Sequence, residues 1–197
     1  MGEKSRFMII GALISSLTAL GAFIKIPIAP YPVPMTLQTG FVFLAGMLLP
    51  KREAFLSQAA YILLGLIGIP VFAHGGGLGY ILDPTFGYLL AFLFSAPLMS
   101  ILYNKTLLRR KYILFALFSV LLILILQLCG VFYMAVISSL HLHTKLPFSR
   151  AAYLTLLFLP LDMVKLLLAA LFSIQIRKRL PFLSLEHNHA KQLSCIP

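Results

Sequence analysis

Two ionisable side chains lie three residues apart in a long apolar stretch near the end of the chain. The stretch reads Leu159-Pro160-Leu161-Asp162-Met163-Val164-Lys165-Leu166. In an α-helix, this spacing puts Asp162 and Lys165 on one face, within about 60° of each other and about 4.5 Å apart along the axis. The pair offers an acceptor-only anion beside a cation with three donors. It suits a small ligand that carries both N–H donors and a carboxylate.

Contact of this pair with lipid is not expected, because a charged side chain at the centre of a membrane helix costs at least about 2.5–3.5 kcal/mol. The alternative is an internal ion pair that only locks neighbouring helices together. A buried ion pair is a weak stabiliser, since desolvation offsets most of the attraction. We therefore interpret Asp162 and Lys165 as ligand-binding residues.

Other polar, glycine and aromatic residues are expected to converge on the same ligand. A loop over residues 70–85 is rich in glycine but mostly apolar, which is better explained by backbone close to a ligand than by a flexible surface hairpin. Each other candidate could instead cap a helix, fill the core or, for Tyr88, belong to an aromatic belt. The complete predicted set for substrate binding is Asp162, Lys165, Thr36, Gln38, Phe43, Gly76, Gly77, Gly79 and Tyr88.

The composition indicates that these residues belong to a membrane protein. The chain is 60% hydrophobic and 11% charged, with a mean hydropathy of +0.99. Soluble domains are nearer 45–50% apolar and about 25% charged, so a soluble fold would expose large apolar patches. The length of 197 residues fits one membrane domain over residues 1–180, followed by a tail over residues 181–197.

Apolar runs between charged residues predict an all-α bundle of six transmembrane helices, of which the second is short and the fifth long. The predicted spans are residues 7–26, 36–49, 54–69, 84–103, 112–140 and 151–176. Twelve of the 16 Lys and Arg residues would share the side of both termini, three would lie opposite, and Lys165 would lie within the last helix. This asymmetry predicts cytoplasmic termini and tail in a multi-pass protein of a bacterial-type cell membrane. Because the basic residues cluster between apolar runs, nucleic acid is not an expected partner.

The first predicted helix carries small residues four apart, a spacing that lets another helix approach closely. These residues are Ala12, Ser15, Ser16, Ala19 and Ala22. By itself the spacing favours packing within the chain over contact with a partner subunit.

Motifs for energy conversion or catalysis are not found in the sequence. It contains no G-x-x-x-x-G-K-[ST], so the glycines at 75–79 do not predict an ATP phosphate cradle. It contains no G-x-S-x-G or H-E-x-x-H motif either. We therefore expect a binding protein that is not an enzyme and holds neither a metal nor a cofactor.

Three segments together are similar to the BioY family, the biotin-specific S components of energy-coupling-factor (ECF) transporters. They are Pro32-Val33-Pro34-Met35-Thr36-Leu37-Gln38-Thr39, the run from Leu64 to Ala73 with the glycine loop after it, and Pro84-Thr85-Phe86-Gly87-Tyr88-Leu89. The Asp162-x-x-Lys165 pair resembles the family in place and spacing. The resemblance extends from the first helix to Ile176.

This resemblance implies a six-helix S component that captures biotin, its transported ligand, from outside the cell. A membrane T component and two ATP-binding cassette ATPase subunits would then couple ATP hydrolysis to release inside. It also implies that the small-residue face of the first helix meets the T component.

The residues themselves leave other functions open. The chain could be an S component for another vitamin, such as riboflavin or thiamine. It could be a stand-alone secondary transporter coupled through protonation of Asp162. A membrane-embedded enzyme using Asp162 and Lys165 as acid and base is disfavoured, because the sequence shows no nucleophile–base set or metal site.

Overall fold

Within the residues that the structure describes, the regular secondary structure is helical apart from one short hairpin, which confirms the predicted all-α class. The computed structural model describes residues 2–27, 33–107, 109–140, 148–180 and 183. Within these residues the α-helices are α1 (Glu3–Phe23), α2 (Gln38–Leu48), α3 (Lys51–Leu66), α4 (Phe86–Lys105), α5 (Tyr112–Leu140) and α6 (Phe148–Arg179). Strand β1 (Lys25–Ile26) pairs antiparallel with β2 (Met35–Thr36), and a 3-10 helix, η1 (Leu78–Leu82), precedes α4. The predicted tail 181–197 lies outside the described residues except for Leu183.

Within the described residues, four helical segments are long and apolar enough to cross a membrane. They are Lys4–Phe23, Phe86–Lys105, Tyr112–Leu140 and Leu157–Arg179. Helices α2 and α3 are shorter, with 11 and 16 residues. Every residue of α2 except Gly40 and Phe41 is buried, which is typical of a core helix enclosed by its neighbours.

The ends of several helices differ from the predicted spans. Helix α1 ends at Phe23 instead of residue 26, because Lys25 and Ile26 pair with β2. Helix α3 is shifted towards the N-terminus relative to the predicted span 54–69: it begins at the charged residue Lys51 and ends before Gly68, whose φ is +110°. Reading from charge to charge missed the start of α3 because a charged residue can continue a helix beyond its apolar part.

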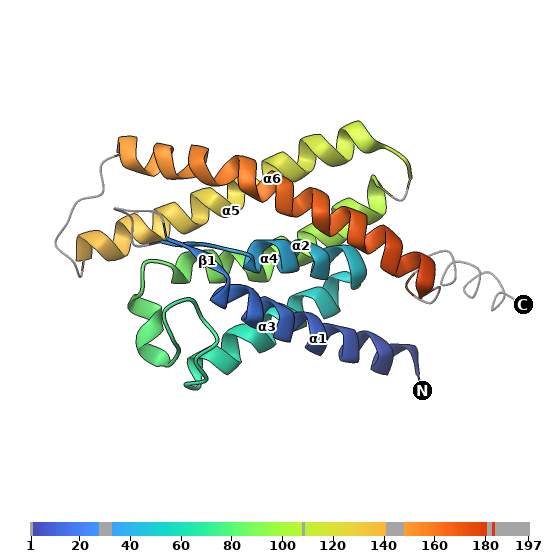
Figure 1. Ribbon diagram of the computed structural model, residues 1–197, viewed down its shortest axis with the longest axis horizontal. Coiled ribbons are helices and arrows are strands. Elements are labelled where there is room, and N and C mark those ends of the chain that lie inside the picture. Colours follow the sequence, from blue (N-terminus) through green and yellow to red (C-terminus); the bar gives the residue numbers. More distant parts are fainter. Residues whose placement is uncertain (1, 28–32, 108, 141–147, 181–182, 184–197) are drawn as a thin grey trace, which may run out of the picture.

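Helix α2 is central to the bundle, since it packs against α1, α4 and α6. Figure 1 shows α2 and α4 between the α1–α3 pair and the α5–α6 pair. The α2–α4 approach is close at Gly46, where a Cβ atom would overlap the backbone of Ala96 and lie 2.6 Å from the Cβ atom of Met99. Glycine is therefore required there for the short helix to reach the centre of the molecule.

Large apolar side chains face outward along the long helices. Ile113 is 85% exposed and Phe132 is 72% exposed, both on α5. Surfaces of this kind are stable in hydrocarbon and not in water. Together with the four spanning helices, they establish that the chain is a membrane protein.

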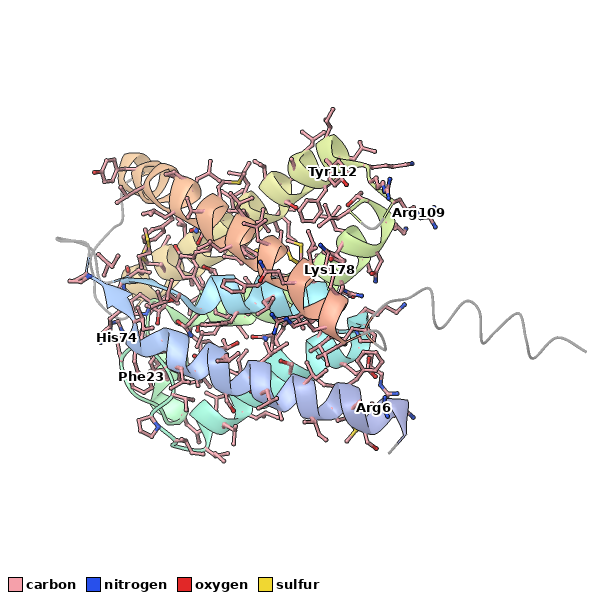
Figure 2. The ribbon with its side chains drawn as sticks, turned by 45° about the vertical axis from the view of Figure 1, so that its right-hand side comes forward. Arg6, Phe23, His74, Arg109, Tyr112 and Lys178 are labelled. Atoms are coloured by element: carbon pink, nitrogen blue, oxygen red, sulfur yellow. The ribbon has the colours of Figure 1, made fainter. Side chains whose placement is uncertain are left out.

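Charged residues gather at one end of the bundle. Figure 2 shows Arg6, Arg109 and Lys178 at the end where α1 begins and α6 terminates, whereas Phe23 and His74 lie at the opposite end. The hairpin and η1 lie at that opposite end as well (Figure 1).

Candidate functional site

Asp162 and Lys165 lie inside the protein on α6, in contact with the first turn of α2. Lys165 Nζ is 2.8 Å from Asp162 Oδ1, and the Asp162 residue is 2% exposed. The hydroxyl of Thr39 donates to the same carboxylate oxygen at 2.9 Å and accepts from Lys165 Nζ at 3.0 Å. The three side chains therefore form a closed hydrogen-bonded triangle between α6 and α2.

Gln127 on α5 completes the environment of the carboxylate. Its Nε2 donates to Asp162 Oδ2 at 2.5 Å, and the residue is 2% exposed. Neither Gln127 nor Thr39 was predicted from the sequence as a site residue. Gln127 is the lone amide in the apolar run 112–140, and a polar side chain in such a run usually bonds to another helix. That signal could have identified it.

A cavity lies beside this cluster, bounded by α2, α4, α5 and α6 and by the ends of the two loops opposite the basic end. Its empty volume is about 500 Å³, a figure that includes the space open to solvent. The lining residues are Val33, Pro34, Met35, Thr36, Gln38, Thr39, Ala73, Tyr80, Thr85, Tyr88, Leu89, Phe92, Gln127, Phe158, Asp162 and Lys165. Seven of these residues have apolar side chains and nine have polar ones, a mixture that suits a small ligand with both apolar and hydrogen-bonding groups.

Part of the hydrogen-bonding capacity in this cavity is unused. The ammonium of Lys165 has three donors, and two of them are engaged by Asp162 and Thr39. The hydroxyl of Tyr88 and Oε1 of Gln127 are buried and have no hydrogen-bond partner among the described residues. The residues on the cavity wall therefore include a cationic donor, a hydroxyl and an amide carbonyl with spare hydrogen-bonding capacity.

A hydrogen-bond chain fixes the β2 side of the cavity. The hydroxyl of Thr36 donates to Gln38 Oε1 at 2.9 Å, and Gln38 Nε2 donates to the Tyr61 hydroxyl at 2.5 Å. Tyr61 donates in turn to the carbonyl of Val71 at 3.1 Å. Both functional groups of Gln38 are thereby engaged, and the chain ties the start of α2 to the glycine loop.

A second chain fixes the loop at the start of α4. The hydroxyls of Tyr80 and Thr85 are 2.8 Å apart, and Thr85 donates to Asp83 Oδ1 at 2.6 Å, so Tyr80 is the donor to Thr85. Burial raises the pKa of Tyr80 to about 12, so this hydroxyl keeps its proton at physiological pH. Asp83 Oδ2 also lies 3.1 Å from His74 Nδ1. The loop is thus held by its own side chains.

The predicted glycines Gly76, Gly77 and Gly79 do not line the cavity. Gly77 has a φ of +102° and donates to the carbonyl of Gly65 at 2.7 Å, and a Cβ atom on Gly76 would overlap the backbone of Ile69. A Cβ atom on Gly79 would meet open space. Gly76 and Gly77 therefore serve the fold of the loop itself, which places Ala73, Tyr80 and Thr85 at the cavity wall.

Phe43 is fully buried in the core and does not line the cavity either. Phe92 and Phe158 line the cavity instead. Helical geometry explains this, because Phe92 lies one turn after Tyr88 and Phe158 lies one turn before Asp162. Of the other predicted site residues, Asp162, Lys165, Thr36, Gln38 and Tyr88 all lie on the cavity wall.

The small residues of α1 divide between two faces. Ser15 is 5% exposed and Ala22 is 0% exposed, so both pack inside the chain, as the spacing alone favoured. Ala12 and Ser16 are exposed, and Ala19 is half-buried. Only this second group is available to a partner.

The described residues contain no cluster of three or more His, Cys, Asp or Glu that could hold a metal ion.

Comparison with known proteins identifies relatives of this chain. The model of the BioY family matches residues 2–182. The biotin transporter BioY of Thermotoga maritima is 32% identical over 174 residues, which cover 88% of this chain and 96% of that protein. A BioY protein of Lysinibacillus sphaericus is 48% identical over 103 residues, and the match covers 52% of each chain, so it spans about half of that relative.

The fold also matches a solved structure. The crystal structure at 2.1 Å of the S-component for biotin from an ECF-type ABC transporter superposes with a TM-score of 0.75 at 27% sequence identity. The match covers 90% of this chain and 95% of that one.

Proposed function

Because the chain belongs to the BioY family, we propose that it is the substrate-binding S component of an ECF-type importer, which captures biotin from outside. The observation that carries the proposal is the buried Asp162–Lys165 pair, which lines a cavity and leaves one ammonium donor unused. The related proteins named biotin transporters and the solved S-component for biotin support the choice of ligand.

Biotin has groups that complement the cavity. Its ureido group carries two N–H donors and a carbonyl acceptor, its thioether ring is apolar, and its tail ends in a carboxylate. The unused donor of Lys165 suits a carbonyl or carboxylate oxygen, and apolar residues such as Leu89, Phe92 and Phe158 suit the ring. A hydrogen bond to a charged donor in a partly buried cavity is stronger than the same bond in bulk water.

The proposal extends to six membrane crossings with both termini in the cytoplasm of a bacterial-type cell. Arg6, Arg109 and Lys178 at one end of the bundle (Figure 2) support this orientation, because cytoplasmic ends carry the excess of Lys and Arg. The cavity then lies towards the outer side. Helices α2 and α3 would provide the other two crossings. Helix α2 is short, so it would cross inside the protein together with the extended β2 segment before it.

The importer would also need partners. We place a membrane T component and two ATP-binding cassette ATPase subunits beside this chain, with the exposed Ala12 and Ser16 of α1 at the contact. ATP hydrolysis by these partners would drive release of biotin inside.

A panel of labelled vitamins tests the substrate. Purified protein in detergent should bind biotin saturably and ignore riboflavin and thiamine, and cells that contain the T component and ATPases should take up biotin. Uptake should persist with a protonophore as long as ATP is maintained, and should stop when the ATPases are deleted. Preferential binding of riboflavin or thiamine would contradict the choice of ligand, and protonophore-sensitive uptake without ATPases would contradict the ECF mechanism.

A further inference from the structure

Gln127 is a buried side chain of the cavity with half of its amide unused. Among the described residues, buried polar side-chain atoms without a partner occur in Gln58, Tyr88, Asn104, Ser119 and Gln127. Of these residues, only Tyr88 and Gln127 line the cavity. An unpaired buried polar atom is costly, so a ligand that satisfies these two atoms gains affinity.

The orientation of the Gln127 amide is determined by its neighbour. Nε2 donates to Asp162 Oδ2 at 2.5 Å, and the reversed amide would place Oε1 against the carboxylate with no proton between them. Oε1 is therefore the group left for a ligand, and it can only accept a hydrogen bond. The hydroxyl of Tyr88 can donate or accept, so it does not discriminate between ligand donors and acceptors.

The other side-chain carboxylate and amide oxygens on the cavity wall each accept at least one hydrogen bond. Asp162 Oδ1 accepts from Lys165 and Thr39, and Asp162 Oδ2 accepts from Gln127. The Oε1 of Gln38 accepts from Thr36. Among these carboxylate and amide oxygens, Oε1 of Gln127 is the one that accepts no hydrogen bond.

We propose that Gln127 is a specificity-determining residue, whose Oε1 accepts a hydrogen bond from an N–H donor of the ligand. This inference rests on the proposed function, which makes the ligand biotin and the donor one of its two ureido N–H groups. A ligand of the same shape with an oxygen at that position would face Oε1 with a second acceptor. It would be rejected for lack of a donor and not for its size.

Two cyclic carbamate analogues of biotin test the role of Gln127, because each replaces one ureido N–H by a ring oxygen with little change of shape. The wild-type protein should bind one of the two at least about tenfold more weakly than biotin, as expected when a buried acceptor loses its donor. Gln127→Met should weaken biotin binding and reduce that preference to less than about threefold, because Oε1 is gone for both ligands. A purely structural role would weaken both ligands equally and leave the preference unchanged.

Two further variants control for folding and for position on the helix. Gln127→Glu can share a proton with Asp162, donating to it while its second oxygen still accepts, so it should retain the preference for biotin even if Gln127→Met fails to insert. Ser119→Ala removes another buried polar group of α5 that does not line the cavity, and it should leave the preference unchanged.

The outcomes separate this inference from the proposed function. Failure of the wild-type protein to bind biotin would contradict both. Tight binding of biotin together with equal binding of both carbamates would contradict the role of Gln127 alone. An unchanged preference in Gln127→Met would do the same.

Discussion

At the scale of residues, Asp162 organises the site and Lys165 presents the unused donor. The carboxylate of Asp162 receives hydrogen bonds from three side chains on α2, α5 and α6. These bonds hold Thr39, Gln127 and Lys165 in fixed positions before a ligand arrives, and such preorganisation reduces the entropy lost on binding. We therefore propose that the ion pair positions groups for a ligand, because a buried ion pair contributes little to stability by itself.

Neutralising either member of the pair should weaken biotin binding. Asp162→Asn loses the anion that holds Lys165, and Lys165→Met loses the donor, so each should cost at least about tenfold in affinity, equivalent to roughly 1–3 kcal/mol for an unpaired buried partner. Equilibrium titration of purified variants with labelled biotin measures this effect.

Lys178→Met is the matched control for the loss of a cation from α6. Lys178 is exposed near the end of the same helix and does not line the cavity. This variant should bind biotin with wild-type affinity. If Lys165→Met bound equally well, the pair would have no part in the site.

At the scale of elements, the site depends on two attachments between α2 and α6, one near each end of α2. At the cavity, Lys165 and Asp162 bond to Thr39. At the basic end, Arg177 donates to the carbonyl of Met47 through Nε at 3.1 Å and Nη2 at 2.6 Å. The guanidinium also lies 5.0 Å from the ring centroid of Tyr103 on α4 and bonds to the carbonyl of Leu183. Arg177 thereby satisfies a carbonyl that the last turn of α2 leaves unpaired.

The helical class and the chemistry of α6 could be predicted from the sequence, because both depend on local patterns. A lack of charge over about 20 residues reveals a long helix, and the i, i+3 spacing places Asp162 and Lys165 on one face. The five predicted residues that line the cavity were the polar ones in apolar surroundings or next to the prolines.

The rest depended on contacts between segments far apart in the sequence. Gln127 reaches Asp162 across 35 positions, and no local pattern shows which helix α5 faces. The glycine loop was interpreted as a ligand contact, although Gly76 and Gly77 are needed for close backbone contacts inside the loop. Phe43 was assigned to the site as an aromatic wall residue, but it is fully buried in the core and does not line the cavity.

At the scale of the whole molecule, the protein is polarised along the bundle. Arg6, Arg109 and Lys178 occupy one end, and the loop that contains His74 occupies the other (Figure 2). The cavity is lined by Ala73 and Tyr80 of that loop. In the proposed orientation the basic end lies in the cytoplasm. The cavity then lies towards the outer side of the membrane, and the ligand would enter from there.

Cysteine labelling in intact cells tests this orientation. In a background with Cys129→Ser and Cys195→Ser, His74→Cys should react with a membrane-impermeant maleimide added outside, because His74 is exposed at the proposed outer end. Arg109→Cys should react only after the membrane is permeabilised. The reverse pattern would place the termini outside and the cavity towards the cytoplasm.

The most direct measurement of the central claim is an experimental structure of the protein with biotin bound. We expect biotin in the cavity between α2, α4, α5 and α6, with one of its oxygens within hydrogen-bond distance of Lys165 Nζ. Biotin bound elsewhere on the protein, with Asp162 and Lys165 paired only to each other and to Thr39, would contradict the account.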